Sequence, residues 1–310
     1  MGGRIPWIEL LLAAYLGVSG VRKRSLSPSG GIAAFIVGFC MFNLRLRAFG
    51  VALVVFYLTG SKATKVGKEL KAKLEEGHQE AGYRNAAQVL CNSFSAFVAA
   101  LLWKALFEPG SWISRVLEGT VLPSTPYDSA QWCAISPAVA DGKSRALLFI
   151  TLGHFACCLG DTLASELGIL SKSPPRLITT LRTVPPGTNG GVSLTGTLAS
   201  VAGGVIMGLT MAFDLLVESK ACRGSLGEVF SVVAWGAAAG LLGSLLDSVM
   251  GATIQRTRYS EDSKRILTDE SGVPKSVTSV KVISGIDILS NNQVNLLSSI
   301  VTAATLAYLA

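Results

Sequence analysis

The chain has 310 residues, of which half are hydrophobic and only 15% are charged. A soluble domain carries about 25% charged residues, and the mean hydropathy here is +0.49, so the composition argues against an ordinary soluble domain. The net charge of +7 is then better explained by basic residues in cytoplasmic loops than by nucleic-acid binding.

Apolar blocks recur along the whole chain, and most are long enough, or nearly so, to cross a hydrocarbon layer of about 30 Å. They predict an all-α, polytopic membrane protein with about eight transmembrane helices in one domain spanning 1–310. The helices are expected at 5–21, 30–43, 48–60, 86–106, 146–170, 192–217, 228–254 and 293–309.

The distribution of basic residues predicts the orientation. With the N-terminus outside, the inside loops 22–29, 61–85, 171–191 and 255–292 hold 18 Lys and Arg residues, and the outside segments hold 8. Since Lys and Arg accumulate on the cytoplasmic side, both termini are expected outside, with cytosolic loops at 61–85, 171–191 and 255–292. The first block runs directly into a basic cluster, so neither a cleavable signal nor a transit peptide is expected.

The six cysteines show no metal-binding spacing, and four of them fall inside apolar blocks. Buried cysteines of this kind behave as small hydrophobes. No disulfide framework is therefore expected.

The loop 61–85 begins with two lysines, Lys62 and Lys65, at the edge of an apolar block. The later lysines and glutamates of this loop have the pattern of a solvated helix. Arg84 and Asn85 follow at the start of the fourth block, and Asn92 lies about two turns further in. Buried amides in a membrane need partners, so ligand contact and helix–helix hydrogen bonds are both open for them.

The fifth block ends in the segment Gly160–Gly168, which reads GDTLASELG. Ionisable residues inside a membrane segment are costly and usually functional, so Asp161 and Glu166 are candidate site residues, with Asp247 near the end of the seventh block as a third. Asp161 and Glu166 are five residues apart and do not share a helical stripe. Paired carboxylates that hold Mg²⁺ through few protein oxygens are common in phosphoryl transfer.

The segment 175–197 has the pattern of a loop feeding a helix N-terminus, where free N–H groups favour an anion. Arg176 and Arg182 add donors suited to phosphate, although a plain turn with a Ser or Thr cap has the same pattern. At the start of the last block, Asn291, Asn292 and Asn295 exceed what a helix cap needs. The clusters fall on inside loops or inside ends of helices, which predicts one cytosol-facing site where a soluble phosphate donor meets a lipid acceptor.

The motifs GDTLASELG, PRLITT, VPPGTNGGVS, GSLLDSVMGA and NNQVN, in this order, closely resemble the transmembrane protein 19 family from about Leu26 to the C-terminus. That family includes the phytyl-phosphate kinases of the vitamin E pathway. The resemblance implies a membrane kinase that transfers phosphate from a nucleoside triphosphate, with CTP expected, to an isoprenyl monophosphate. It also implies an endomembrane protein, for which the endoplasmic reticulum is expected.

Residues matching the family motifs are implied to bind nucleotide or substrate. With the polar residues above, the expected binding set is Arg84, Asn85, Asn92, Thr162, Ser165, Arg176, Thr179, Thr180, Gly187, Thr188, Asn189, Gly190, Gly191, Asn291, Asn292 and Asn295. The sequence departs from the family in two places, with Leu163 where Trp is expected and Ser290 where Asp is expected. A missing carboxylate at 290 would lower metal affinity unless Asp287 substitutes for it.

The expected mechanism assigns Mg²⁺ on the donor phosphates to Asp161, Glu166 and Asp247. Charge neutralisation on the transferred group is expected from Lys62, Lys65, Arg84 and Arg176, and the isoprenyl tail is expected between helices. A transporter is an open alternative, because half-helices, glycine breaks and intramembrane acids also occur in carriers. A non-catalytic scaffold is a third alternative, suggested by Ser290.

Overall fold

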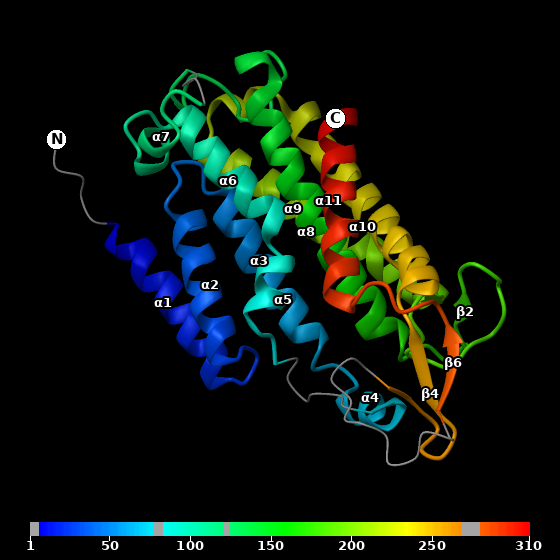
Figure 1. Ribbon diagram of the computed structural model, residues 1–310. Helices are drawn as coiled ribbons and strands as arrows, with labels where there is room; N and C mark the ends of the chain where they lie inside the picture. The colour runs from blue at the N-terminus through cyan, green and yellow to red at the C-terminus, as the bar shows by residue number, and fades with distance from the viewer. Residues whose placement is uncertain (1–5, 77–82, 121–124, 268–279) are drawn as a thin grey trace.

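The structure is a computed structural model that describes residues 6–76, 83–120, 125–267 and 280–310 (Figure 1). Its helices are α1 (Trp7–Arg22), α2 (Pro28–Phe42), α3 (Ala48–Ala63), α4 (Lys68–Leu74), α5 (Ala86–Cys91), α6 (Phe94–Phe107), α7 (Trp112–Val116), α8 (Lys143–Gly168), α9 (Leu194–Glu218), α10 (Leu226–Ile254) and α11 (Asn291–Leu309). Short 3₁₀ turns occupy Ala140–Gly142 and Ala221–Gly224.

Each of the eight apolar blocks coincides with helix, so the predicted helical architecture is confirmed. Among the described residues, three helices are long and apolar enough to span a membrane, namely α8 with its preceding turn, α9 and α10. The apolar helices α2, α3 and α6 are shorter. Length and composition therefore support three spans, and the count of eight stays a prediction.

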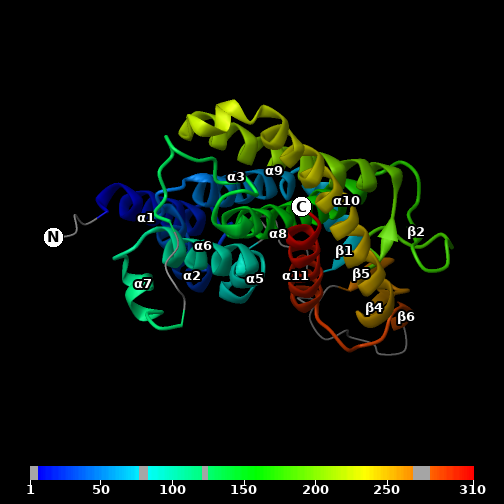
Figure 2. The same cartoon turned by 90° about the horizontal axis from the view of Figure 1, so that it is seen from above.

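Helix α8 is the centre of the bundle. In its apolar stretch 78% of the residues are buried, against 44% in α9 and 39% in α10. Helices α3, α6, α9, α10 and α11 pack around it, whereas α1 lies at one edge and packs on α2 (Figure 2). The polar residues near the end of α8 are therefore surrounded by several other elements.

Helices α8, α9 and α10 approach one another at glycines. A Cβ atom added to Gly160 would lie 2.7 Å from the Gly240 carbonyl oxygen, and one added to Gly203 would lie 2.9 Å from Gly160. A Cβ atom added to Gly204 would overlap the Gly236 carbonyl oxygen. Close approach at small residues is typical of packed membrane helices, and here it sets Asp161 beside the turn of α10 that carries Ser244 and Asp247.

The fourth apolar block is not one helix, because α5 and α6 are separated at Asn92 and Ser93. Ser93 has φ −133°, outside the helical range, and its hydroxyl donates to the Val89 carbonyl at 2.9 Å. The break places Asn92 inside the bundle at a change of chain direction. The expectation of a continuous helix over 86–106 is wrong at this point.

Two small sheets lie at one end of the bundle. The larger joins β1 (Glu75–Glu76), β5 (Arg265–Leu267), β4 (Thr257–Ser260) and β6 (Val280–Ser284) in that order, with β1 parallel to β5 and the other pairs antiparallel. The smaller pairs β2 (Arg176–Leu177) with β3 (Gly191–Val192). The sequence predicted none of these strands, since each has five residues or fewer and no alternating apolar pattern.

The loops predicted as cytosolic gather at one end, together with α4 and the sheets, which we call the α4 end (Figure 1). The opposite end carries α7 and the 3₁₀ turns, and we call it the α7 end. There a disulfide joins Cys133 to Cys222, whose Cα atoms are 4.6 Å apart. The expectation of no disulfide is wrong, because antiparallel packing brings together two loops that are 89 residues apart in sequence.

Candidate phosphate and lipid site

The carboxylates of Asp161 and Asp247 lie on α8 and α10, close enough to interact electrostatically. Asp161 is hydrogen-bonded to the Ser244 side chain, and Asp247 Oδ2 accepts a hydrogen bond from Ser298 Oγ at 2.9 Å. Within the described residues, neither carboxylate makes an ion pair. Two carboxyl groups are thus held next to each other between α8 and α10, each beside a serine hydroxyl.

Helix α11 completes this pocket with an amide. The Asn295 side chain, oriented so that both of its contacts are hydrogen bonds, donates to Asp247 Oδ2 at 3.2 Å and to the Asn291 carbonyl at 3.0 Å. The Asn291 amide oxygen accepts from Gln255 Nε2 at 3.5 Å, and Asn292 lies half-buried on the same turn. Asn295 therefore bonds directly to Asp247, and Asn291 is bonded to Asn295 and Gln255; ligand binding by these asparagines stays a prediction.

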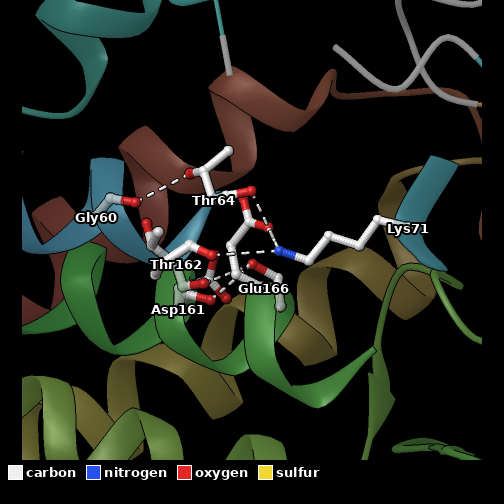
Figure 3. Close-up of polar contacts among 8 residues, drawn as sticks. Gly60, Thr64, Lys71, Asp161, Thr162 and Glu166 are labelled. Atoms are coloured by element: carbon white, nitrogen blue, oxygen red, sulfur yellow. Dashed lines mark hydrogen bonds and ion pairs between the residues drawn. The ribbon is translucent and has the colours of Figure 1, made fainter. Parts of the chain in front are cut away.

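Glu166 forms the second acidic point, and it is paired with Lys71 of α4 (Figure 3). The Lys71 side chain is only 1% exposed and its Nζ atom lies 2.5 Å from Glu166 Oε2. Lys71 also donates to the carbonyls of Ala63 and Thr64 at 3.3 and 3.4 Å. The interpretation of this lysine run as a solvated helix is wrong for Lys71, because α4 docks this one residue against the end of α8.

Arg84 supplies a second cation next to the acidic segment. Its Nη1 atom donates to Ser61 Oγ at 3.2 Å. A Cβ atom added to Gly60 would lie 3.7 Å from Arg84 Nη2 and 3.7 Å from Thr162 Cγ2, so both side chains lie near this glycine. Burial lowers the pKa of the Arg84 guanidinium, and the nearby Glu166 carboxylate opposes that shift. An arginine remains charged under these conditions, so the site keeps a poorly hydrated cation.

Lys62 and Lys65, predicted to be catalytic, are both exposed. Asn85 is exposed and forms a capping box with Gln88 at the start of α5, in which each side chain accepts from the other residue's backbone N–H. The Ser165 hydroxyl donates to the carbonyls of Asp161 and Thr162 within α8. These four residues are near the α4 end, but their contacts within the described residues are local.

The loop 175–191 divides into two parts. Its tip is exposed and carries Arg176, Thr179, Thr180 and Arg182, with Arg176 bonded to the Leu181 carbonyl at 3.1 Å. The glycine part packs on α10: a Cβ atom on Gly190, whose φ is +75°, would lie 2.5 Å from the Ser248 carbonyl oxygen. The glycine part of the loop therefore contacts α10 at Ser248, the residue that follows Asp247.

Backbone N–H groups in the glycine part are already bonded. The N–H groups of Thr188 and Gly191 donate to carbonyls within the loop, and that of Asn189 donates to Thr257 Oγ1 at 3.2 Å. Thr188 is buried, Gly187 has φ +88°, and Ser193 caps α9 by accepting from Gly196 N. The loop thus has the conformation of a capped turn, and anion binding by it stays a prediction.

Ser290, where an acidic residue was expected, is exposed and caps α11. Its N–H and hydroxyl donate to Gln293 Oε1 at 2.8 and 3.1 Å. Asp287, considered as a substitute ligand, is 63% exposed and pairs with Arg256 at 2.8 Å. Neither residue contacts the Asp161–Asp247 pair in these bonds, so the departure at 290 concerns a helix cap.

The donor set fits a hard divalent cation in part. Oxygen ligands from Asp161 and Asp247, with Ser244 and Ser298 beside them, suit Mg²⁺, which keeps water and phosphate in its other positions. The described residues contain no group of three or more His, Cys, Asp or Glu side chains arranged for a metal. Glu166 is bonded to Lys71, so the aspartate pair fits the ion better than Glu166 does.

The family model for an integral membrane protein, DUF92, matches residues 11–303 of this chain. The chain belongs to this family. Protein PGR of Arabidopsis thaliana is 39% identical over 295 residues, which cover 95% of this chain and 92% of that protein. The membership confirms the resemblance drawn from the motifs and confirms an integral membrane protein.

Two further relatives are more distant. An uncharacterized membrane protein of Methanocaldococcus jannaschii is 28% identical over 252 residues, covering 81% of this chain and 83% of that protein. Protein VTE6, chloroplastic, of Arabidopsis thaliana is 28% identical over 195 residues, covering 62% of this chain and 48% of that protein. No solved structure matches the chain.

Proposed function

We propose that this protein is a membrane kinase that transfers a phosphate from a nucleoside triphosphate to an isoprenyl monophosphate, giving a diphosphate. The observation that carries the proposal is the group of polar residues toward the α4 end of the bundle. It comprises the Asp161–Asp247 pair, the buried Lys71 bonded to Glu166, and the half-buried Arg84, which also lines an apolar cavity. The family resemblance supplies the isoprenyl acceptor, and CTP is the expected donor.

The chemistry requires little covalent participation by the protein. An oxygen of the lipid phosphate attacks the γ-phosphorus of the nucleotide, the bond from that phosphorus to the β-phosphate oxygen breaks, and the nucleoside diphosphate leaves. Catalysis of this step consists mainly of positioning and charge neutralisation. No strong general base is needed, since the attacking group is already an anionic phosphate.

The acidic and the basic residues of the site have different proposed roles in this step. Asp161 and Asp247 would hold Mg²⁺, which when bound neutralises the donor phosphates. Arg84 offers planar donors that suit a phosphate monoester. Lys71 holds Glu166 against α4 and so fixes the end of α8, while the asparagine amides of α11 orient Asp247. Each assignment uses a contact described above.

The decisive assay uses purified protein in nanodiscs with CTP, Mg²⁺ and geranylgeranyl monophosphate. Diphosphate product is expected, and Asp161→Asn is expected to abolish it. Lys73→Met, an exposed change on α4, is the matched control and keeps activity. A panel of the other nucleoside triphosphates names the donor. No product from any prenyl phosphate or nucleotide, while a related protein of the family works in parallel, would reject the kinase.

The alternative of a transporter differs from the kinase in where the substrate binds. Asp161 lies in the half of α8 toward the α4 end, seven residues before the helix end, or about 10 Å at the helical rise. Carriers bind substrate near the membrane midplane. Flux of prenyl phosphate into proteoliposomes, lost in Asp161→Asn, would favour the carrier over the kinase.

We also propose an endomembrane location, with the endoplasmic reticulum first. The disulfide at the α7 end supports this, since disulfides persist where the compartment is oxidising. It agrees with the orientation predicted from Lys and Arg, which puts the α7 end outside the cytosol.

A further inference from the structure

An apolar cavity of about 70 Å³ lies between α1, α2, α3 and the turn after α5, and it opens partly to the surroundings. The lining is hydrocarbon from Leu16, Val37, Leu53 and Phe56 over most of its length. A polar molecule gains nothing in such a space, whereas an apolar chain does.

The end of the cavity at the α4 side is polar. Arg84 and Tyr57 line it, with Leu26 beside them. The Arg84 backbone is fixed there, because its N–H donates to the Ser25 carbonyl at 3.1 Å and its own carbonyl accepts from Ser27 N at 2.9 Å. The turn between α1 and α2 therefore holds one cation in the lining, whose other polar residues are Tyr57, Asn92 and Ser93.

Gly30 is needed for this arrangement. A Cβ atom there would lie 2.2 Å from the Arg84 carbonyl oxygen, so any side chain would force α2 away from the arginine. The Arg84 guanidinium and the Thr162 methyl group both lie near Gly60, and Thr162 follows Asp161 in α8. Arg84 therefore lies near the segment of α8 that carries the first aspartate.

Phe42, the last residue of α2, also lines the cavity. Gly38 lies beside it, and a Cβ atom on Gly38 would lie 3.5 Å from the Phe42 ring and 3.7 Å from Ala13. Those are ordinary contacts, so a methyl group would fit at 38 but a longer side chain would extend into the cavity. Along α2 the lining runs from Ala34 to Phe42, a rise of about 12 Å.

We propose that this cavity is the acceptor-lipid site, which binds a single-chain isoprenoid phosphate with its phosphate at Arg84 and its tail pointing toward Phe42. The proposal rests on the proposed function and names where the acceptor binds and what sets its length. An apolar cavity with one cation in its lining matches a lipid that has one chain and an anionic head. The phosphate then lies next to Thr162 and within reach of the α8–α10 aspartates.

The test measures binding without nucleotide, so that it does not depend on phosphoryl transfer. Protein in nanodiscs is photolabelled with geranylgeranyl monophosphate that carries a diazirine at its tail end, and the labelled peptides are mapped by mass spectrometry. Label is expected on α2 near Phe42 and is competed by unlabelled geranylgeranyl monophosphate. Geranylgeraniol, which lacks the phosphate, competes more weakly.

Three variants check the assignment. Arg84→Gln is expected to weaken binding about tenfold, as for loss of a hydrogen bond to a charged group, while Arg22→Gln, an exposed change at the end of α1, leaves binding unchanged. Gly38→Leu shifts the preferred acceptor to a shorter chain. Phe42→Ala shifts it to a longer chain, while Ile36→Ala on the exposed face of the same helix does not. Since Phe42→Ala enlarges the space, it remains informative if Gly38→Leu does not fold.

The outcomes separate the two proposals. Label that spreads over outward-facing residues of α1 and α2 and ignores all three variants means bulk lipid only, and it overturns the acceptor site even if kinase activity is found. Label near Phe42 that depends on Arg84 supports the site even if no diphosphate forms, and the kinase proposal then fails alone.

Discussion

Lys71 is the residue whose environment differs most from its sequence context. It lies in a run of lysines and glutamates, yet only 1% of its side chain is exposed and it pairs with Glu166 at 2.5 Å. Removing one partner of a buried ion pair leaves a charge without compensation, which costs roughly 3–5 kcal/mol in fully buried cases. Glu166 is 22% exposed, so the cost here is expected to be smaller.

We predict that Lys71→Met lowers both thermal stability and kinase activity. The double variant Lys71→Met/Glu166→Gln should recover the stability, because no charge is left unpaired, but not the activity. Stability is measured by thermal unfolding in detergent, and Lys73→Met, exposed on the same helix, is the control. If Lys71→Met and Lys73→Met behave alike, the ion pair contributes nothing to the site.

For the aspartate pair we predict that removing one charged group raises the thermal stability, whereas removing Lys71 lowers it. Asp161 and Asp247 lie close enough to interact, and ionisation of both neighbouring carboxyl groups is unfavourable without a cation. Asp247→Asn is therefore expected to raise the unfolding temperature in EDTA, to remove the stabilisation by Mg²⁺ and to abolish activity.

The matched control is Asp287→Asn, whose carboxylate is exposed and paired with Arg256. A surface pair of this kind contributes roughly 0–1 kcal/mol, so the control should keep its response to Mg²⁺. A wild-type protein that shows no Mg²⁺-dependent shift, or an Asp247→Asn variant that keeps it, would remove the metal from the model of the site.

The sequence could predict some of these residues and not others for a physical reason. Asp161, Asp247 and Asn295 are polar groups inside apolar blocks, where burial is costly enough to be informative. Lys71 carries no such signal, because its burial comes only from docking of α4 on α8. Lys62 and Lys65 had the stronger sequence argument, since they directly follow an apolar block, yet both are exposed.

At the scale of elements, the position of the site depends on how closely α8, α9 and α10 approach. A Cβ atom on Gly240 would lie 2.5 Å from the Ser200 carbonyl oxygen and 2.8 Å from Gly204 Cα. Those are backbone atoms, so the helices rather than a side chain would have to move. Gly240 also faces α8, since a Cβ atom on Gly160 would lie 2.7 Å from the Gly240 carbonyl oxygen. That contact sets the distance between the helices that carry Asp161 and Asp247.

We predict that Gly240→Ala destabilises the protein, since overpacking costs about 1–3 kcal/mol. Gly227→Ala is the control in the same helix, where an added methyl group meets nothing within 4 Å. That change should instead stabilise slightly, because alanine favours a helix over glycine by about 1 kcal/mol. Thermal unfolding and activity of the two variants check this, and equal unfolding temperatures would contradict the close packing.

The helices were predictable because each apolar block is long enough to be recognised as a helix from its hydrophobic residues. The break at Ser93 was not, since a serine is tolerated within a helix and the sequence around it stays apolar. The four-stranded sheet was also missed, because β1 has two residues and pairs with β5, about 190 positions later in the chain. Pairings of that kind are set by where the helices end.

At the scale of the whole molecule, the two ends of the bundle differ in chemistry. The α4 end has the charged cluster and most of the loop lysines, whereas the α7 end has the Cys133–Cys222 disulfide among buried aromatic rings, including Trp132 stacked edge-on against Tyr127. A soluble nucleotide and an oxidised disulfide need opposite compartments. The disulfide was not predictable because it depends on the return of α9 to the end where α8 begins.

We therefore predict that the disulfide and the site face opposite sides of the membrane. In sealed microsomes from expressing cells, a reductant that cannot cross membranes should leave Cys133–Cys222 intact, and permeabilisation should expose it to reduction. A cysteine introduced by Lys73→Cys on α4 should react with an impermeant maleimide before permeabilisation. Counting maleimide adducts by mass gives both results in one sample, with Cys133→Ser/Cys222→Ser as the blank for the disulfide. Reduction of the disulfide in sealed microsomes would mean that the α7 end faces the cytosol, and protection of position 73 would mean that the α4 end does not. Either result would contradict the kinase proposal, because the site could not then bind a cytosolic nucleoside triphosphate.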